Sequence, residues 1–550
     1  MAALLWLLPL LLADAKWEGR ANCRKVQRPA ESWDQCQRHC ASGGCSAFFD
    51  PESQTCTLQE AHPSSKCGEH VEVYVMMPLD LVGTDGKLAS QERLDKIWAA
   101  LETSGADGFM VDSWWGITEP EPKEYNFAAY RELVNQVAKM QPSAQAGGNC
   151  SVEAKLRGFK VQVVSSFHQC GGNVGDECYI LLPDFVRNTS GIWYKDAEGQ
   201  ETQEYISLFA DTVEIAGRTP LQMYGDWFAA FAAEFAAELG DPIVEVMVGL
   251  GPCGEMRYPS YPLDRWNFPG IGQFQCYDEH ALQSLRLAGG EHRLPRETGT
   301  YNSRPQDTSF FSQGYASPDG QLFLEWYSDS LKRHASDVLR SARAAFQNKL
   351  RLAAKISGLH WWYSDPSHAA EVTAGYYNTN GHNAYAEIAK VLKAAGADVF
   401  DFTCLEMRDR EQPSEAASSP ENLIQQSQAA AAAAGLSFAG ENALQRYDQA
   451  AYDQMLSYKD QLHSLTYLRV TETLMRPVNL QRFRRFVKSM HGTDKAETAP
   501  AMNDESVQPA QRSFQAASHQ AFGAREFEAC AYKGSAWIVL GFWLTAILLQ

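Results

Sequence analysis

The middle of the chain, from about residue 70 to 490, alternates short apolar runs with longer amphipathic stretches. The apolar runs contain many β-branched and aromatic residues and are bounded by polar or glycine-containing segments, which is typical of buried strands. They lie at 71–79, 107–112, 159–167, 243–250, 355–363, 397–404, 436–441 and 464–470.

The stretches between these runs have the periodicity of amphipathic helices. The clearest lie at 91–103, 223–239, 323–350 and 382–395, and six consecutive alanines at 429–434 form another helix, which the glycine that follows should end. Eight strand-then-helix units over about 420 residues predict an α/β fold, a (β/α)8 TIM barrel with long loops. A doubly wound open sheet is the alternative.

Polar and aromatic side chains follow directly after the predicted strands. A barrel carries its chemistry at the C-terminal ends of its strands, so these side chains predict an active site on that rim. The set comprises Asp80, Asp112, Trp114, Trp115, His168, Glu255, His360, Trp361, Trp362, Asp401, Thr403, Glu406, Glu441, Asn442 and Arg469.

Two glutamates are the strongest catalytic candidates, because Glu255 and Glu441 each close a strand and each follow a glycine. Two carboxylates on one rim suit glycoside hydrolysis, in which one protonates the leaving oxygen and the other activates water or attacks. The tryptophans nearby would stack on sugar rings; for Trp361 and Trp362, packing in the core is the alternative. A single glutamate is usually a solvated or paired surface residue, so the hypothesis depends on the pair.

A glycine motif near the first glutamate suggests a different function. Gly249-x-Gly251-x-x-Gly254 follows a predicted strand, as it does in dinucleotide-binding folds. That reading needs a helix after the last glycine, and two prolines within the next eight residues forbid it. We therefore interpret the glycines as allowing a sharp turn that keeps bulk away from Glu255.

Other chemistries are less well supported. His168, Cys170 and Cys178 offer three soft metal ligands, but their spacing matches no common zinc pattern, and we expect no metal or other cofactor. No G-x-S-x-G motif of a serine hydrolase occurs. The net charge of −19 argues against nucleic acid as a partner.

The N-terminal region predicts secretion. Residues 1–15 form a short apolar run that ends in a small-x-small pattern, which is typical of a cleaved signal peptide. Residues 16–68 then contain six of the 13 cysteines, and we expect disulfides only there. These six are Cys23, Cys36, Cys40, Cys45, Cys56 and Cys67. Their spacing resembles the PAN/apple type of module, which binds proteins or carbohydrates; a small cap without a binding role is the alternative.

The C-terminal region predicts a linker and an apolar tail after a catalytic domain at 69–492. Residues 493–533 are rich in Ala, Ser, Gln and Glu without apolar periodicity. Residues 534–550 are apolar but shorter than the roughly 20 residues of a spanning helix. A removable lipid-anchor signal, a short tail anchor and an interfacial helix remain open. We expect the secretory pathway as the destination and this tail as the place of any membrane contact.

Seven stretches of the central region resemble the signature sequences of beta-amylases, glycoside hydrolase family 14. In order they read FHQCGGNVGD, VGLGPCGEMRYPSYP, KISGLHWWY, HAAEVTAGYYN, DFTCLEMRD, QPSEAASSPENLIQQ and AGENALQRYD. The resemblance implies a (β/α)8 barrel that removes maltose from the non-reducing ends of α-1,4-glucans such as starch, with inversion. A catalytically silent glucan sensor on the same scaffold is the alternative, and the presence of both glutamates favours activity.

The resemblance also implies roles for individual residues. Glu255 in GPCGEMRYPS matches the general acid, and Glu441 in AGENAL matches the general base. Asp176 ends a glycine-rich loop that in the family closes over the substrate, and Thr403 belongs to an inner loop near the base. The positions that match substrate-binding residues are Asp112, His168, Asp176, Lys355, His360, Thr403, Asn442, Ala443 and Arg469.

Three positions depart from the family pattern. Asp401 stands where the family usually has Asn, Ser113 where Val or Thr is common, and Cys253 where Ala is common. An extra acidic group at 401 could raise the pKa values of the acid and the base, or it could pair with Lys355. We expect it to affect the rate and the pH optimum more than the type of reaction.

Overall fold

The computed structural model describes residues 23–29, 45–50, 55–61, 70–140, 158–172, 178–290 and 293–492. The predicted signal peptide, Asp176, the linker and the apolar tail lie outside the described residues. Within 23–61 the strands are described but their side chains are not, so the predicted cysteine pairings there stay predictions.

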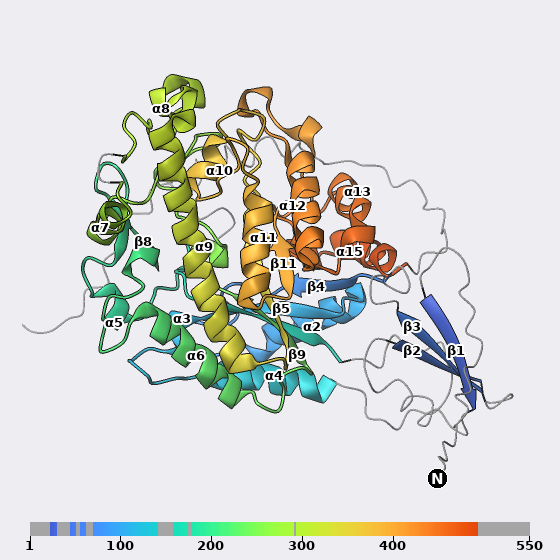
Figure 1. The fold of residues 1–550 in the computed structure, drawn as a ribbon. Coiled ribbons are helices and arrows are strands. Elements are labelled where there is room, and N and C mark those ends of the chain that lie inside the picture. Colours follow the sequence, from blue (N-terminus) through green and yellow to red (C-terminus); the bar gives the residue numbers. More distant parts are fainter. Residues whose placement is uncertain are drawn as a thin grey trace, which may run out of the picture. The chain divides into compact units, whose positions relative to one another are not determined.

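Eight parallel strands close into a barrel (Figure 1). In order around the barrel they are β4 (Glu72–Met76), β5 (Gly108–Trp114), β6 (Lys160–Ser166), β9 (Ile243–Val248), β10 (Arg351–Ile356), β11 (Val399–Phe402), β12 (Ser437–Glu441) and β13 (Ser464–Tyr467), which pairs again with β4. The predicted (β/α)8 barrel is confirmed, and the open sheet is wrong. Strands buried on both faces explain why the sequence shows continuous apolar runs.

The inside of the barrel has an apolar layer below a polar one. Side chains alternate between the barrel interior and the helix layer along each strand. One interior cluster consists of Met76, Met110, Val164, Met247, Ala353, Val399 and Ala439. Lys355 on β10, Asp401 on β11 and Glu441 on β12 each lie two residues after a member of this cluster. They therefore also face the barrel interior. The apolar layer thus forms a floor, and polar groups lie toward the C-terminal ends of the strands.

Helices surround the strands. The longer ones are α2 (Gln91–Ser104), α4 (Ala128–Met140), α6 (Pro220–Glu234), α7 (Glu279–Leu287), α9 (Pro318–Phe346), α11 (Ala384–Ala395), α12 (Pro420–Ala434), α13 (Gln449–Ser457) and α15 (Pro477–Met490). The short ones are α3 (Trp115–Thr118), α5 (Asp184–Arg187), α8 (Ser309–Ser312), α10 (Ala369–Thr373) and α14 (Glu472–Met475). Figure 1 shows α9, α11 and α12 side by side on the outside of the barrel. The alanine-rich helix α12 ends where predicted, with Gly435 in the left-handed conformation (φ 70°).

Two smaller sheets complete the described structure. In the segment between β6 and β9, β7 (Trp193–Lys195) pairs with β8 (Glu201–Ile206), and sequence patterning missed both. Near the N-terminus, β1 (Cys23–Pro29), β2 (Cys45–Asp50) and β3 (Thr55–Ala61) form an antiparallel sheet in the order β1-β3-β2. The PAN/apple resemblance of this segment stays a prediction.

The structure corrects the position of one strand and the placement of the disulfides. β10 begins at Arg351, so the predicted run 355–363 starts near its end and is mostly loop. Cys170 and Cys178 are bonded to each other, with Cα atoms 5.7 Å apart. The expectation of disulfides only within 23–67 is therefore wrong. Backbone pairing between Cys170 and Ile180 brings the two cysteines together, and the bonded sulfurs are no longer available as metal ligands.

The first and last parts of the barrel meet at Asp107. Its carboxylate accepts hydrogen bonds from the backbone N–H of Val73 (2.8 Å) and from His491 Nε2 (2.8 Å), and His70 Nε2 lies 3.5 Å away. Burial works to raise the pKa of Asp107, but the bonds from His491 and His70 outweigh it and lower the pKa. This is the one group of His, Cys and acidic residues in the described ranges whose ligand atoms are close enough to share a metal. Because these contacts already use both carboxylate oxygens, we interpret the group as a hydrogen-bonded link between the chain segments.

Replacing Asp107 by Asn should destabilise the fold by about 2 kcal/mol at neutral pH, because it removes charge-assisted hydrogen bonds. Since the folded-state pKa is lowered, this contribution should be lost in the wild type as the pH falls below about 4. Urea unfolding of the wild type and the variant at several pH values measures this contribution to the free energy of unfolding. The control is Asp80→Asn, whose ion pair with Arg93 (2.7 Å) is exposed and worth less than about 1 kcal/mol. Equal losses in the two variants at pH 7 would contradict the assignment.

Candidate active site

A buried ion pair lies inside the barrel near the C-terminal ends of its strands. Glu441, the last residue of β12, is fully buried, and the ammonium of Lys355 on β10 lies 2.8 Å from one of its oxygens. Burial alone would lower the pKa of Lys355, but the negative charges of Glu441 and Asp401 raise it. Lys355 is therefore a cation, and it stabilises negative charge on Glu441.

The second glutamate lies next to the same lysine through the backbone. Glu255 follows β9 and a 3-10 turn (Pro252–Gly254), and the N–H of the next residue, Met256, donates to the carbonyl of Lys355 (2.8 Å). Arg257 donates to the Glu255 carboxylate (2.6 Å), whose side chain is 12% exposed where that of Glu441 is 0% exposed. Lys355 thus links the two predicted catalytic residues, and Glu255 is the more accessible.

The glycines before Glu255 make room for backbone. A Cβ at Gly249 would lie 2.1 Å from the carbonyl oxygen of Ser165, and one at Gly251 would lie 2.6 Å from that of Glu255. After Gly254 the chain is extended rather than helical (Glu255 φ −79°, ψ 147°). The dinucleotide-binding alternative lacks the helix that it requires, and the interpretation of these glycines as turn and close-approach residues is supported.

Asp112 and His168 come from neighbouring strands of the barrel. One oxygen of Asp112 accepts a hydrogen bond from Ser166 Oγ (2.7 Å), and burial raises the pKa of Asp112. Burial lowers the pKa of His168 to about 3, helped by the charges of Lys355 and Arg257. His168 is therefore a neutral imidazole that can exchange hydrogen bonds with hydroxyl groups.

Several buried polar atoms around the site have no hydrogen-bond partner within the described part of the chain. Burial also lowers the pKa of His360 to about 4, so this imidazole is neutral too. The unpartnered atoms of the predicted substrate-binding residues are Asp112 Oδ2, His168 Nδ1, His360 Nδ1 and Arg469 Nη1. Buried polar groups nearly always have partners, so these atoms point to a polar ligand such as a sugar.

The remaining predicted binding residues hold loops in place. Thr403 Oγ1 accepts from the N–H of Gly358 (2.7 Å), which joins the ends of β10 and β11. The side chain of Asn442 donates to the carbonyl of Leu468 (2.7 Å) and accepts from its N–H (2.8 Å), next to Arg469. The last of these residues, Ala443, follows Glu441 by two positions.

Glu406 is one of the predicted rim residues, but the sequence indicated no role for it. It is fully buried and accepts hydrogen bonds from the backbone N–H groups of Ala443 (3.1 Å) and Leu444 (2.7 Å). Burial raises its pKa to about 7, although these bonds oppose the shift. Glu406 therefore fixes the loop that follows Glu441. The feature of the sequence that pointed to Glu406 is its position just after a strand.

The expectation that tryptophans line the site for stacking is wrong. Trp114, Trp115, Trp361 and Trp362 are all buried in the hydrophobic core. The indole N–H of Trp361 donates to the carbonyl of Gly270 (2.9 Å), and the indole N–H of Trp362 donates to the carbonyl of Pro269. These rings pack the loops of the rim against each other.

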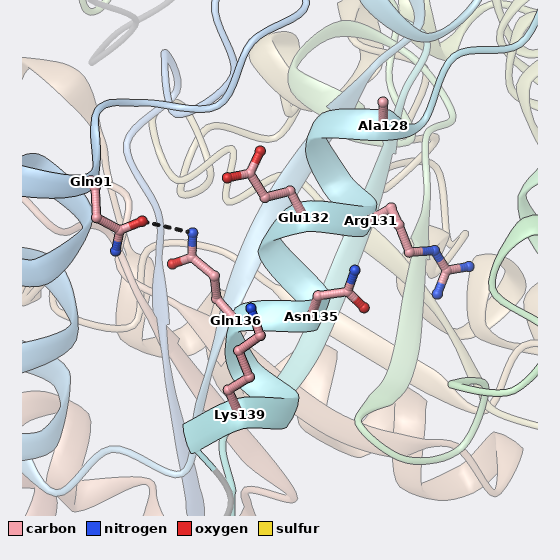
Figure 2. Close-up of a pocket in the computed structure, with 7 residues that line it drawn as sticks. All are labelled: Gln91, Ala128, Arg131, Glu132, Asn135, Gln136 and Lys139. Carbon is pink, nitrogen blue, oxygen red and sulfur yellow. Dashed lines mark hydrogen bonds between the residues drawn. The ribbon is translucent and has the colours of Figure 1, made fainter.

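A hollow in the outer helix layer is not this site. Figure 2 shows it between α2 and α4, where Gln136 donates a hydrogen bond to Gln91 (3.1 Å). It is lined by polar side chains such as Glu132 and Lys139, and none of the predicted site residues contributes to it.

Two glutamates at the C-terminal ends of barrel strands, among buried polar groups with unused hydrogen-bonding atoms, define a barrel hydrolase of the glycosidase class. The model of glycosyl hydrolase family 14 matches residues 74–496. The chain belongs to this family.

Individual relatives agree with the family match. The chain is 44% identical over 462 residues to "Beta-amylase 2, chloroplastic" of Oryza sativa subsp. japonica, covering 78% of this chain and 80% of the relative. It is 42% identical over 454 residues to "Beta-amylase 1, chloroplastic" of Arabidopsis thaliana, covering 77% and 76%. The crystal structure of the catalytic domain of beta-amylase from Paenibacillus polymyxa superposes with a TM-score of 0.62 at 28% identity, covering 78% of this chain and 100% of that one.

The predicted destination is corrected by the comparison. The secretory pathway and a membrane anchor in the tail were expected from the two chain ends, whereas the rice and Arabidopsis relatives are chloroplastic by name. Of the helices that the structure describes, none has the length and apolar character needed to cross a membrane. The leader and the tail, on which the expectation rested, lie outside the described residues.

Replacing Gly249 by Ala should destabilise the protein by about 1–3 kcal/mol, because the added methyl group meets a backbone oxygen that cannot move aside. Activity should fall as well, since the shift would move the loop that carries Glu255. Gly225→Ala in α6 is the matched control: the nearest atom to its Cβ is 3.7 Å away, so it should be neutral or stabilising. Thermal unfolding and starch hydrolysis of both variants check this, and equal behaviour would refute the steric argument.

Proposed function

We propose that Glu255 and Glu441 are the acid and the base with which this enzyme removes maltose from the non-reducing ends of starch-type α-1,4-glucans, and that it releases the maltose as the β-anomer. Membership of family 14 and the beta-amylase relatives support hydrolysis of these glucans. The observation that carries the site assignment is the pair of glutamates joined through Lys355.

The two glutamates differ in a way that suits an acid and a base. Glu441 is buried and forms an ion pair with the Lys355 ammonium, and a base must be charged to take a proton from water. Glu255 is the more accessible of the two, as an acid must be to reach the oxygen of the leaving sugar. An inverting reaction also needs room for water between the two groups.

The surrounding polar atoms supply sugar recognition. Asp112, His168, His360 and Arg469 each have a buried atom that lacks a partner among the described residues. Sugar hydroxyls both donate and accept, so they can satisfy carboxylate, imidazole and guanidinium groups at once. Thr403, Asn442 and Ala443 would shape the loops around the sugar. Asp176 would contribute from the glycine-rich loop, as the family resemblance implies. A silent glucan sensor is not favoured, because both carboxylates are present.

Glu255→Gln and Glu441→Gln should each lower the turnover of starch by at least about 100-fold, because each removes the only group that transfers a proton on its side of the bond. Circular dichroism and maltose binding by calorimetry should stay near the wild type. Glu132→Gln on the outer face of α4 is the control and should keep full activity. If either active-site variant retained more than about a tenth of the wild-type rate, its assigned role would be wrong.

The first product from starch should be β-maltose, released without a rapid fall in chain length. Inversion follows when water attacks opposite the leaving group. Proton NMR of a fresh digest resolves the anomers before they interconvert, and chromatography of the remaining polymer reports where cleavage occurs. An α-anomer, or early short chains, would overturn the proposed reaction course.

A further inference from the structure

A second carboxyl group lies in the same buried layer as the ion pair. Asp401 on β11 is 2% exposed and lies opposite Lys355 of β10 and opposite Ala439 of β12 in the strand register. Its neighbour two residues earlier, Val399, belongs to the interior cluster, so Asp401 also faces inward. Lys355, Asp401 and Glu441 therefore occupy adjacent interior positions on three consecutive strands.

The charges of this layer do not balance if all groups are ionised. The titratable groups that interact across it are Lys355 (β10), Glu441 (β12), Glu245 (β9), Asp112 (β5), Arg469 after β13, and Glu255 on the rim. Glu245 pairs with Arg351 (3.1 Å), and Glu255 with Arg257 (2.6 Å).

The remaining acid of the set, Asp112, interacts most strongly with the charge of Arg469. Lys355 is then left to face two buried carboxyl groups, Asp401 and Glu441. Two ionised carboxylates that share one buried cation are unfavourable.

The hydrogen-bonding pattern leads to the same conclusion. Asp401 Oδ2 and Glu441 Oε1 are both buried and have no hydrogen-bond donor among the described residues. An ionised carboxylate only accepts, so two of them cannot satisfy each other. A single proton on one carboxyl group turns it into a donor to the other and removes both unsatisfied atoms.

We propose that Asp401 carries this proton in the working enzyme and donates a hydrogen bond to Glu441, so that Asp401 positions Glu441 and leaves the charge of Lys355 to it. The catalytic consequence rests on the proposed role of Glu441 as the base. In support, burial and then the negative charge of Glu441 raise the pKa of Asp401 well above its ordinary value. Asp401 is a positioning residue, since it acts through Glu441.

Ionisation of Asp401 at high pH should disturb the site. The new charge repels Glu441 and competes for Lys355, so activity should fall on the alkaline side. Asp401→Asn keeps the shape and can donate the same hydrogen bond, but it cannot ionise. Asp401→Ala has no donor. Asn should therefore keep the turnover number near the wild type and extend activity to higher pH, whereas Ala should lower the turnover number more than it changes KM.

The protonation state is tested without reference to activity. A carboxyl group with a raised pKa in the fold holds a proton that the unfolded chain releases above about pH 4. Wild-type stability should therefore fall, relative to Asp401→Asn, as the pH rises from that value toward the pKa in the fold. The ratio of the two unfolding constants should change by up to about tenfold per pH unit. Urea unfolding of both full-length proteins at several pH values measures it, and a ratio that is independent of pH would overturn the proposal.

A spectroscopic measurement on the wild type guards against a variant that folds poorly. Infrared difference spectra should show the carbonyl stretch of a protonated carboxylic acid at neutral pH, and one such band should be missing in Asp401→Asn. Identical bands in the two proteins would contradict the proposal. An active Glu441→Gln variant would remove the base assignment, yet the stability and infrared results would still report the proton on Asp401. Failure of the inference and failure of the proposed function are thus distinguishable.

Discussion

The ion pair between Lys355 and Glu441 is the interaction on which the site depends. Burying either charge alone would be costly, so each requires the other. The carbonyl of the same lysine accepts a hydrogen bond from Met256, which fixes the loop that carries Glu255. One residue of β10 therefore sets the position of both glutamates, one through its side chain and one through its backbone.

The barrel places this pair where chemistry is possible. Because interior side chains recur at every second residue, an apolar layer at Ala353, Val399 and Ala439 supports a polar layer two residues later. The polar layer would be unfavourable without internal partners, and Lys355 and hydrogen bonds at the rim supply some of them. Buried atoms of Asp112, His168, His360 and Arg469 have no partner among the described residues, so they are available to a polar ligand.

The fold could be predicted from the sequence because parallel strands are buried on both faces and appear as continuous apolar runs. A side chain that follows such a run lies at the rim, which is why Glu255 and Glu441 could be proposed as the acid and the base. The sequence pattern misplaced β10 because its segment, Arg351–Ile356, contains two alanines and a lysine and is therefore not a continuous apolar run. That the side chain of Lys355 points into the barrel follows from the register of β10 with β11, which the sequence does not show.

Other features depend on contacts that no local pattern records. Trp361 and Trp362 lie beside the rim in sequence, but they are buried in the core, where hydrogen bonds to the carbonyls of Gly270 and Pro269 hold their indole groups. The bond between Cys170 and Cys178 depends on the backbone pairing of Cys170 with Ile180. Glu406 follows a strand as the proposed acid and base do, and only its hydrogen bonds to the loop after Glu441 indicate that it supports this loop.

The most direct test of the assignment of Glu255 and Glu441 is a crystal structure of the Glu441→Gln variant with a bound maltodextrin. We expect the scissile bond to lie between the side chains of residues 255 and 441, whose carboxyl-type groups should be about 6.5–9.5 Å apart, as inversion requires. Sugar hydroxyls should meet the unpartnered atoms of Asp112, His168 and Arg469. A sugar bound away from these residues, or a separation near 5 Å, would contradict it.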